Sequence, residues 1–199
     1  MELTKMPEAD YFLVKRALNN DTFCGDTGII KEFDSKIFIG IIDVLGHGEG
    51  THEIALTCED FLGKNYRQDL VKTMEGLHRH IRGSRGAVAG LCLLDLKTGD
   101  LKYVGMGDIT ARKFGSSNIT IISRAGVVGY VMPTPREERL KLYDGDVLVL
   151  YIDGVKKHFD MEDYPELISD NARTIATRII ERFGKEADDA LCIALRYRI

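Results

Sequence analysis

The sequence predicts an α+β layered domain, and three observations support this class. Apolar runs of strand length recur along most of the 199 residues and are separated by turn residues such as Gly, Asn, Asp and Ser. Two amphipathic helical patterns stand early in the chain, and a third stands late. No repeat, low-complexity tract or linker divides these elements. We therefore expect a single domain over residues 1–199, in which the helices cover a sheet.

The first part of the chain is expected to hold three strands and then two helices. Tyr11–Leu18 has strand composition, and Asn19-Asn20-Asp21 is a turn signal after it. Asp26–Phe33 and the apolar run Ile37–Ile42 follow as the next strands. Apolar residues then recur at helical spacing in two successive segments: Ile54, Cys58, Phe61 and Leu62, and then Val71, Met74, Leu77 and Ile81.

From Ala87 onward the apolar pattern changes to that of short strands. The loop Asp144-Gly145 is the strongest two-residue hairpin signal in the sequence. A late helix is marked by Ala172, Ile175, Ala176, Ile179 and Phe183. Strands are expected at Ala87–Leu96, Leu101–Met106, Ile109–Phe114, Asn118–Ser123, Val127–Met132, Arg139–Tyr143, Asp146–Ile152 and Ala190–Tyr197.

A carboxylate stands at the end of the apolar run Ile37–Ile42. This run reads as a strand buried on both faces, and it stops at Asp43, before a glycine-rich turn. Upstream, Asp34-Ser35 is a plausible two-residue hairpin loop, and in that register Asp26 lies directly opposite Asp43. A slip of one residue would remove this pairing. Like charges on facing residues repel, so the register indicates a bound cation or a shared proton.

Further aspartates stand at strand ends. Asp153 ends the buried strand Asp146–Ile152, and Asp188 and Asp189 precede the last strand. Because the end of one antiparallel strand lies beside the start of the next, these side chains and Asp43 can meet at one rim of a sheet or sandwich. Carboxylates without CxxC cysteines or paired histidines suit Mg²⁺ or Mn²⁺ rather than zinc. Two such ions can activate water for displacement at phosphorus. The alternative interpretation of each aspartate is an ordinary turn residue.

Composition narrows the class of protein further. The net charge of −4 argues against a nucleic-acid binder, which is usually basic. No apolar run approaches the roughly 20 residues of a membrane span, and MELTKMPEAD lacks the apolar core of a signal peptide. The four cysteines show no CxxC spacing, so we expect reduced, mostly buried thiols in a cytoplasmic protein that does not bind membranes.

Six motifs in order resemble one family. They are Cys-Gly-Asp at 24–26, DVLGHG at 43–48, RGAVAGLCLLD at 85–95, YVGMGD at 103–108, YIDG at 151–154 and ADDALCIAL at 187–195. Each is weak alone, but together they resemble the metal-dependent (type 2C) protein phosphatases in their SpoIIE-like bacterial branch, over about residues 10 to 198. The resemblance implies a central antiparallel β-sandwich flanked by α-helices, in α-β-β-α layers.

The resemblance also implies a binuclear centre of Mn²⁺ or Mg²⁺, with a third ion in some relatives. Asp43 resembles the residue that bridges both metals, and the carbonyl of Val44 would complete one coordination sphere. Asp153 and Asp188 resemble the other carboxylates on the first ion, with Asp189 as the alternative to Asp188. Asp26 resembles the carboxylate on the second ion. The remaining positions are Asp108, linked to the third metal, and Arg85, our candidate for a phosphate contact.

Two departures from the family pattern concern the phosphate and the last strand. Leu191 stands where relatives often have Thr, and no arginine is identifiable as the phosphate clamp of larger relatives. We expect a monomeric phosphoserine/phosphothreonine protein phosphatase in which water attacks phosphorus directly, with Asp43 and Asp153 at the catalytic centre. The resemblance implies phosphorylated STAS-domain stressosome proteins as partners. The alternatives are a catalytically inactive phosphatase-like domain that binds phosphorylated partners and a hydrolase of small phosphoesters.

Overall fold

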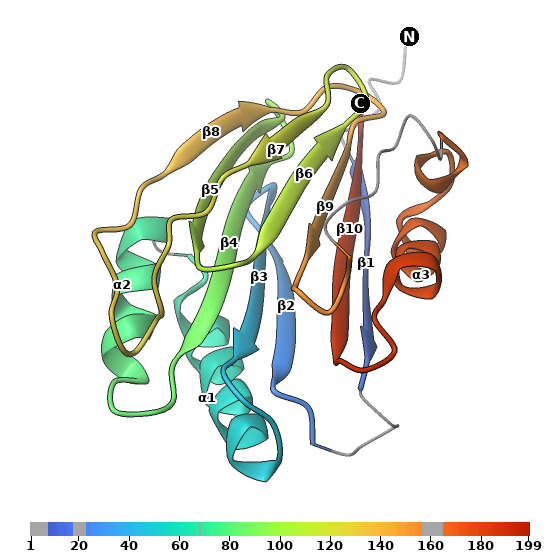
Figure 1. Ribbon diagram of the computed structural model, residues 1–199. Helices are drawn as coiled ribbons and strands as arrows, with labels where there is room; N and C mark the ends of the chain where they lie inside the picture. Colours follow the sequence, from blue (N-terminus) through green and yellow to red (C-terminus); the bar gives the residue numbers. More distant parts are fainter. Residues whose placement is uncertain (1–7, 18–22, 68, 157–164) are drawn as a thin grey trace, which may run out of the picture.

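Two antiparallel sheets pack face to face, and three α-helices cover their outer faces (Figure 1). The computed structural model describes residues 8–17, 23–67, 69–156 and 165–199, so the predicted turn Asn19-Asn20-Asp21 lies outside the described residues. One sheet has the strand order β1-β10-β9-β6-β7, and the other has the order β2-β3-β4-β5-β8. The strands are β1 (Glu8–Arg16), β2 (Asp26–Phe33), β3 (Lys36–Val44), β4 (Ala87–Asp95), β5 (Asp100–Met106), β6 (Thr110–Phe114), β7 (Ile119–Ile121), β8 (Glu138–Lys141), β9 (Val147–Tyr151) and β10 (Ala190–Arg198).

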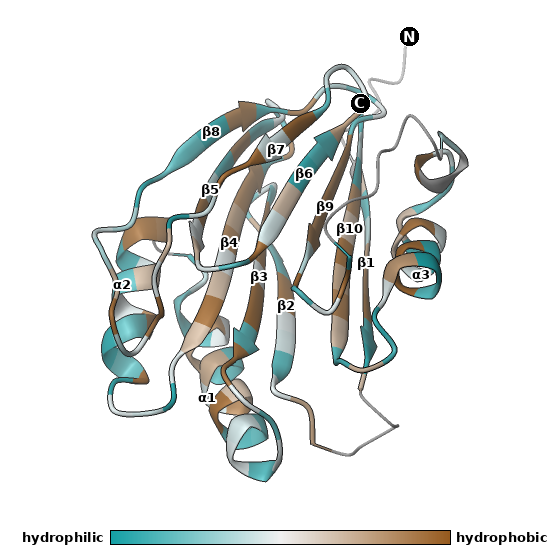
Figure 2. Cartoon of the chain, in the orientation of Figure 1, coloured by the Kyte–Doolittle hydropathy of each residue, from teal (hydrophilic) through white to brown (hydrophobic). Residues whose placement is uncertain are grey.

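Apolar side chains fill three layers of core, which confirms the predicted α-β-β-α order. The central layer lies between the sheets and contains Ile39, Leu150 and Ile193. Helices α1 (Glu49–Asn65) and α2 (Leu70–His80) pack on the outer face of the sheet that contains β2 and β8. Helix α3 (Ala172–Phe183) packs on the outer face of the other sheet, and the short 3₁₀ helix η2 (Pro165–Ile168), which precedes α3 in the chain, lies against it. Figure 2 shows apolar residues along the central strands and on the inner faces of these helices.

The β2–β3 hairpin has the register that the sequence predicted. Asp34 and Ser35 have φ of 48° and 59°, so both central residues adopt the left-handed conformation that a type I′ turn requires. Phe33 pairs with Lys36, and Asp26 pairs with Asp43 at the other end of the hairpin. The register prediction is confirmed, although neither turn residue is the glycine that this turn favours.

The predicted hairpin at Asp144-Gly145 is wrong. A turn does form, because Asp146 donates its N–H to Tyr143 O at 2.9 Å, but β8 pairs with β5 while β9 pairs with β10 and β6. The chain therefore crosses from one sheet to the other at this turn. The crossing is fixed by Asp146, whose carboxylate is buried and lies 2.9 Å from the Nζ atom of buried Lys113.

The predicted strand Val127–Met132 is also wrong. Gly129 has φ of 85°, and Val127 N donates to Val131 O at 2.7 Å, so this segment folds back on itself as a tight turn. A single bridge between Ala87 and Val128 joins the turn to β4. On its other side, Gly129 N donates to Nδ1 of His78, on α2, at 2.9 Å.

Among the helices of the described residues, none is both long enough and apolar enough to cross a bilayer.

Candidate metal centre

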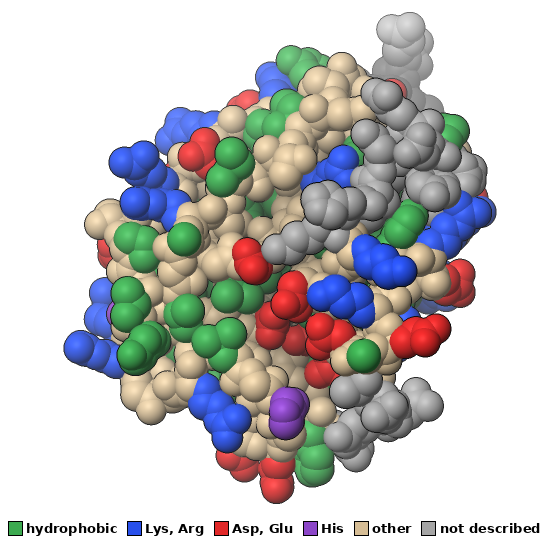
Figure 3. All heavy atoms as spheres, viewed as in Figure 1, with side chains coloured by type: hydrophobic (Ala, Val, Ile, Leu, Met, Phe, Trp, Pro, Cys, Tyr) green, Lys and Arg blue, Asp and Glu red, His purple; other side chains and the backbone are tan. Residues whose placement is uncertain are grey.

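The hairpin and the end of β9 bring aspartates from both sheets to one edge. Asp26 opens β2 and is buried, with 3% of its surface exposed, while its partner Asp43 is partly buried near the end of β3. Asp153 follows β9, and Asp188 and Asp189 precede β10, the neighbouring strand. Figure 3 shows acidic side chains gathered near the middle of one face, with apolar side chains to the left of them.

A glycine allows the loop after β9 to lie against the loop before β10. A Cβ atom on Gly154 would lie 1.6 Å from the carbonyl oxygen of Asp189, so no other residue fits at position 154 without a shift of the chain. Two backbone hydrogen bonds hold this approach: Ile152 N donates to Leu191 O at 3.3 Å, and Lys185 N donates to Gly154 O at 2.8 Å. Asp153 is thereby fixed beside the start of β10.

The carboxylates interact electrostatically. Burial, followed by the charges of Asp153 and Asp188, raises the pKa of Asp43 to about 7. Burial, followed by the charges of Asp43 and Asp189, raises the pKa of Asp26 to about 9. The pKa of Asp188 is raised by burial and then by Asp153. Several carboxylates close enough to perturb one another form a site that is unfavourable unless a positive charge compensates it.

The residues present fit hard divalent cations. The Oδ2 atom of Asp26 is buried and has no hydrogen-bond partner in the part of the chain that the structure describes. An orphaned buried carboxylate oxygen carries a substantial desolvation cost, which a cation would offset. The surrounding donors are mainly carboxylate oxygens, the ligands that Mg²⁺ and Mn²⁺ prefer. The charge of Lys15 lowers the pKa of Asp26, and its Nζ donates to the Asp26 carbonyl oxygen at 2.5 Å.

The remaining predicted ligand is a backbone carbonyl at the end of β3. Val44 N donates to Gly25 O at 3.2 Å, and a Cβ atom on Gly25 would lie 3.3 Å from the oxygen of Val44. The glycine thus leaves this side of the carbonyl uncovered. Val44 directly follows Asp43, so its oxygen is at the same end of the strand.

The predicted phosphate contact, Arg85, and the predicted third-metal ligand, Asp108, lie at the margin of the aspartate cluster. Arg85 is exposed, and its Nη1 lies 2.9 Å from the position that a Cβ on Gly46 would take, so it covers the loop after Asp43. Asp108 is exposed beyond the end of β5, two strands along the sheet from Asp43. Gly107, beside it, packs against Val88, the β4 partner of Asp43. Both side chains thus stand at the acidic edge without being part of its centre.

The family model for Stage II sporulation protein E (SpoIIE) matches residues 34–198, which is most of the chain. The chain belongs to the SpoIIE family. The family that the six motifs indicated is therefore confirmed, and the chain is a PP2C-type serine/threonine phosphatase domain, a class of metal-dependent hydrolases.

Relatives of this SpoIIE-family chain agree in sequence and in fold. Phosphoserine phosphatase RsbX of Bacillus subtilis (strain 168) is 20% identical over 164 residues, which cover 78% of this chain and 82% of RsbX. A crystal structure of RsbX in complex with magnesium has a TM-score of 0.84 at 15% identity, with 95% of each chain covered. A chain from "The bacterial stressosome: a modular system that has been adapted to control secondary messenger signaling" has a TM-score of 0.88 at 25% identity, and 95% of this chain and 100% of that chain are covered.

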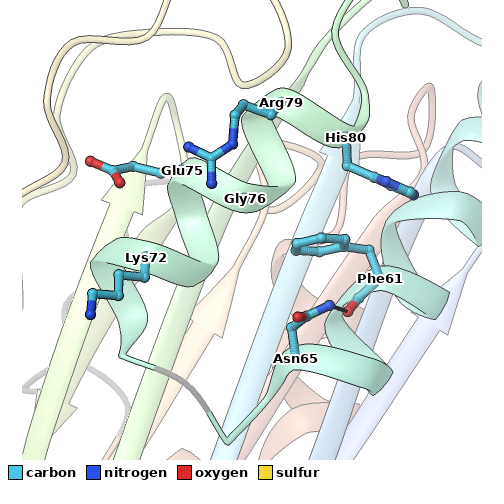
Figure 4. A pocket seen from close by; sticks show the side chains of 7 residues that line it. All are labelled: Phe61, Asn65, Lys72, Glu75, Gly76, Arg79 and His80. Atoms are coloured by element: carbon cyan, nitrogen blue, oxygen red, sulfur yellow. Dashed lines mark hydrogen bonds between the residues drawn. The ribbon is translucent and has the colours of Figure 1, made fainter.

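A groove lies between α1 and α2 and is lined by side chains of both helices (Figure 4). It has a volume of about 480 Å³, and Phe61 of α1 packs against Gly76 of α2, where a Cβ would lie 2.8 Å from the ring. None of the clustered aspartates is among its seven lining residues, which are Phe61, Asn65, Lys72, Glu75, Gly76, Arg79 and His80. The clustered aspartates of this SpoIIE-family chain therefore lie outside this groove.

Sequence reasoning missed two members of the cluster. Cys24 was expected only as a buried thiol, and Asp189 only as the alternative to Asp188, yet ligand atoms of Cys24, Asp26 and Asp189 all lie within 4.8 Å of one another. Both adjacent aspartates interact with the cluster: burial and then the charge of Asp153 raise the pKa of Asp188, and burial, the charge of Asp43 and then the charges of Asp189 and Asp188 raise the pKa of Asp26. Cys24 and Asp26 stand on either side of Gly25, a bend before β2, so the sequence pattern gives no direct signal that their side chains meet.

Gly154→Ala is expected to destabilise the protein by about 1–3 kcal/mol and to weaken Mn²⁺ binding. The added methyl group would collide with the Asp189 carbonyl and force Asp153 away from the start of β10. Urea unfolding and equilibrium dialysis with Mn²⁺ measure the two effects. Gly63→Ala is the matched control: in α1 its Cβ meets Ile29 at an ordinary 3.5 Å, and a gain of about 0.5–1 kcal/mol is expected. Unchanged Mn²⁺ affinity in Gly154→Ala would contradict the positioning role of this glycine.

Proposed function

We propose that the chain is a phosphoserine/phosphothreonine protein phosphatase with a binuclear Mn²⁺ or Mg²⁺ centre at the acidic edge. The observation that carries the proposal is the meeting of aspartates from both sheets around an unsatisfied, buried oxygen of Asp26. In this proposal Asp43 contacts both ions, Asp153 and Asp188 hold the first, and Asp26 holds the second. The carbonyl oxygen of Val44 completes the set, and Asp108 serves a third, weaker ion.

When bound, the two ions supply Lewis acidity and lower the pKa of water for attack at phosphorus. The chain's own residues keep the site ready for this chemistry. Lys15 favours the ionised form of Asp26, so that this buried carboxylate can act as a ligand. The hairpin register keeps Asp26 and Asp43 opposite each other. Arg85, beside the loop after Asp43, is placed to bind the phosphate of a substrate.

The aspartates lie on one face of the molecule (Figure 3) and not among the residues that line the groove between α1 and α2, which suits a phosphorylated protein better than an enclosed small molecule. We propose that the substrate is a phosphorylated STAS-domain component of a stressosome, which the enzyme dephosphorylates to reset signalling. The likeness to the phosphoserine phosphatase RsbX and to a chain from the bacterial stressosome supports this substrate class. A cytoplasmic location is part of the proposal, and the four free, buried cysteines support it.

The test compares metal-dependent phosphate release from a phosphoserine STAS-domain protein and from p-nitrophenyl phosphate. We expect Mn²⁺-dependent turnover of both, with kcat/KM at least about tenfold higher on the protein, because remote contacts contribute to transition-state binding. Binding of the phosphoprotein without turnover, in a sample that binds Mn²⁺, would identify an inactive phosphatase-like domain instead. Equal or faster turnover of the small phosphoester would identify a hydrolase of small substrates.

A further inference from the structure

The Asp26 end of the cluster contains sulfur as well as oxygen. The Sγ atom of Cys24 and carboxylate oxygens of Asp26 and Asp189 lie within 4.8 Å of one another. Cys24 and Asp26 are almost fully buried, with 2% and 3% exposed. Asp189 is partly exposed, which leaves a path from solvent to the three ligand atoms.

Two observations separate this cluster from a chance grouping of a thiol with acids. The Oδ2 atom of Asp26 is buried and has no hydrogen-bond partner among the described residues, so a polar group within the cluster still lacks a ligand. The second observation is that the backbone of Cys24 is held in place. Its carbonyl oxygen accepts a hydrogen bond from Nδ1 of His52 at 3.1 Å, and the ring of His52 packs against Phe23. These contacts fix the stretch of backbone from which the Cys24 side chain extends.

Thiolate and carboxylate ligands together favour a different ion from carboxylates alone. Zn²⁺ binds Cys sulfur at about 2.3 Å and carboxylate oxygen at about 2.0–2.2 Å in tetrahedral geometry. Ligand atoms around such an ion are about 3.3–3.8 Å apart, so the cluster needs only a small contraction from 4.8 Å. Mg²⁺ and Mn²⁺ prefer oxygen and gain little from sulfur. A thiol therefore shifts the preference of this position toward Zn²⁺.

We propose that Cys24, Asp26 and Asp189 form a thiophilic cation position that binds Zn²⁺, with water as the fourth ligand. The thiol of Cys24 releases its proton to solvent as the Zn–S bond forms. The position is the Asp26 end of the metal centre, and in this respect the inference rests on the proposed function. Zn²⁺ bound there would compete with the hard cation that Asp26 holds during phosphatase activity.

Cobalt substitution tests this directly, since Co²⁺ bound to a thiolate has a sulfur-to-metal charge-transfer absorption that carboxylate ligands do not produce. We expect this band when Co²⁺ is added to the wild-type protein, and its loss on titration with Zn²⁺. Cys24→Ser should abolish the band and weaken Zn²⁺ binding by about 10–100-fold in calorimetry, while Mn²⁺ binding changes much less. Cys58→Ser, which removes another fully buried thiol, from α1, should keep the band.

The outcomes distinguish this inference from the proposed function. If Co²⁺ and Mn²⁺ bind but wild-type protein shows no charge-transfer band, the zinc position is overturned and the phosphatase centre stands. A band that persists in Cys24→Ser overturns the assignment of the ligand as well. Absence of any divalent binding by the wild-type protein would overturn both. Asp189→Asn offers a second variant at a partly exposed position, and it should weaken Zn²⁺ binding even if Cys24→Ser does not fold.

Discussion

Asp43→Asn is expected to abolish Mn²⁺-dependent hydrolysis of phosphoserine protein and, at the same time, to stabilise the metal-free protein. The loss of activity follows because Asp43 is proposed to contact both ions. If the ions no longer stabilise the transition state by several kcal/mol, kcat/KM falls by about 10³-fold or more. The gain in stability follows because burial and the charges of Asp153 and Asp188 disfavour the ionised form of Asp43. Removal of this charge should raise the free energy of unfolding by roughly 1 kcal/mol or more.

Phosphate release and urea unfolding without metal measure the two effects of Asp43→Asn. Asp60→Asn is the matched control, because Asp60 is an exposed aspartate of α1 that pairs with Lys64 four residues later. The Asp60→Asn change should alter the free energy of unfolding by less than about 0.5 kcal/mol and leave phosphate release unaltered. If Asp43→Asn kept its activity, Asp43 would not bridge the ions. If it lowered the stability of the metal-free protein, the aspartates would not repel one another in the way described here.

Lys113→Met is expected to destabilise the protein by about 3–5 kcal/mol, the largest effect on stability among the changes considered. The Lys113 and Asp146 side chains are only 2% and 1% exposed and lie 2.9 Å apart. Loss of the lysine would leave Asp146 charged and buried where the chain crosses between the sheets. Activity measured well below the unfolding temperature should persist, since Asp146 precedes β9 and Asp153 follows its other end.

Two variants control the Lys113 experiment. The double variant Lys113→Met with Asp146→Asn should recover part of the lost stability, because no unpaired buried charge remains. Lys64→Ala breaks an exposed pair with a separation of 2.6 Å and should cost less than about 1 kcal/mol. A similar cost for Lys64→Ala and Lys113→Met would show that burial does not decide the value of the pair.

The buried Lys113–Asp146 pair also predicts how the free energy of unfolding changes at acid pH. Burial by itself would raise the pKa of Asp146, but hydrogen bonds from the backbone of Ser116 and Tyr143 and from Lys113 lower it below its usual range. A carboxyl with a lowered pKa in the folded protein contributes stability above its unfolded pKa of about 3.9, and this is lost as the pH falls through the folded value. Urea unfolding should therefore show a shallower decline below about pH 4 in Asp146→Asn than in the wild-type protein.

Short sequence patterns predicted the β2–β3 hairpin correctly but failed at Asp144-Gly145, where the chain crosses between the sheets. The reason is how far apart in the sequence the deciding residues lie. Only two residues separate β2 from β3, so the turn alone fixes which residues face each other, and Asp26 and Asp43 follow from it. Asp144-Gly145 also turns the chain, but β8 and β9 find their partners in different sheets. That choice depends on Lys113, more than 30 residues away, and no local pattern contains it.

The gathering of the aspartates was predictable where strand ends carry them and less so where loops do. Asp43 and Asp153 stand out because each comes directly after an apolar run, Ile37–Ile42 or Val147–Ile152. The positions of Asp189 and Cys24 depend on how the loops before β10 and β2 lie against each other, which no local pattern contains. The fold-back at Gly129 was missed because six apolar or small residues in a row, Val127–Met132, are typical of a strand, whereas a positive φ and a contact with His78 decide the structure.

Crystals grown with Mn²⁺, with diffraction recorded on both sides of the manganese absorption edge, test the binuclear centre most directly. The account predicts two anomalous peaks at the acidic edge, one between Asp43, Asp153 and Asp188 and the other between Asp43 and Asp26. Manganese bound elsewhere, or only to surface carboxylates while Asp43 and Asp26 remain without an ion, would contradict it.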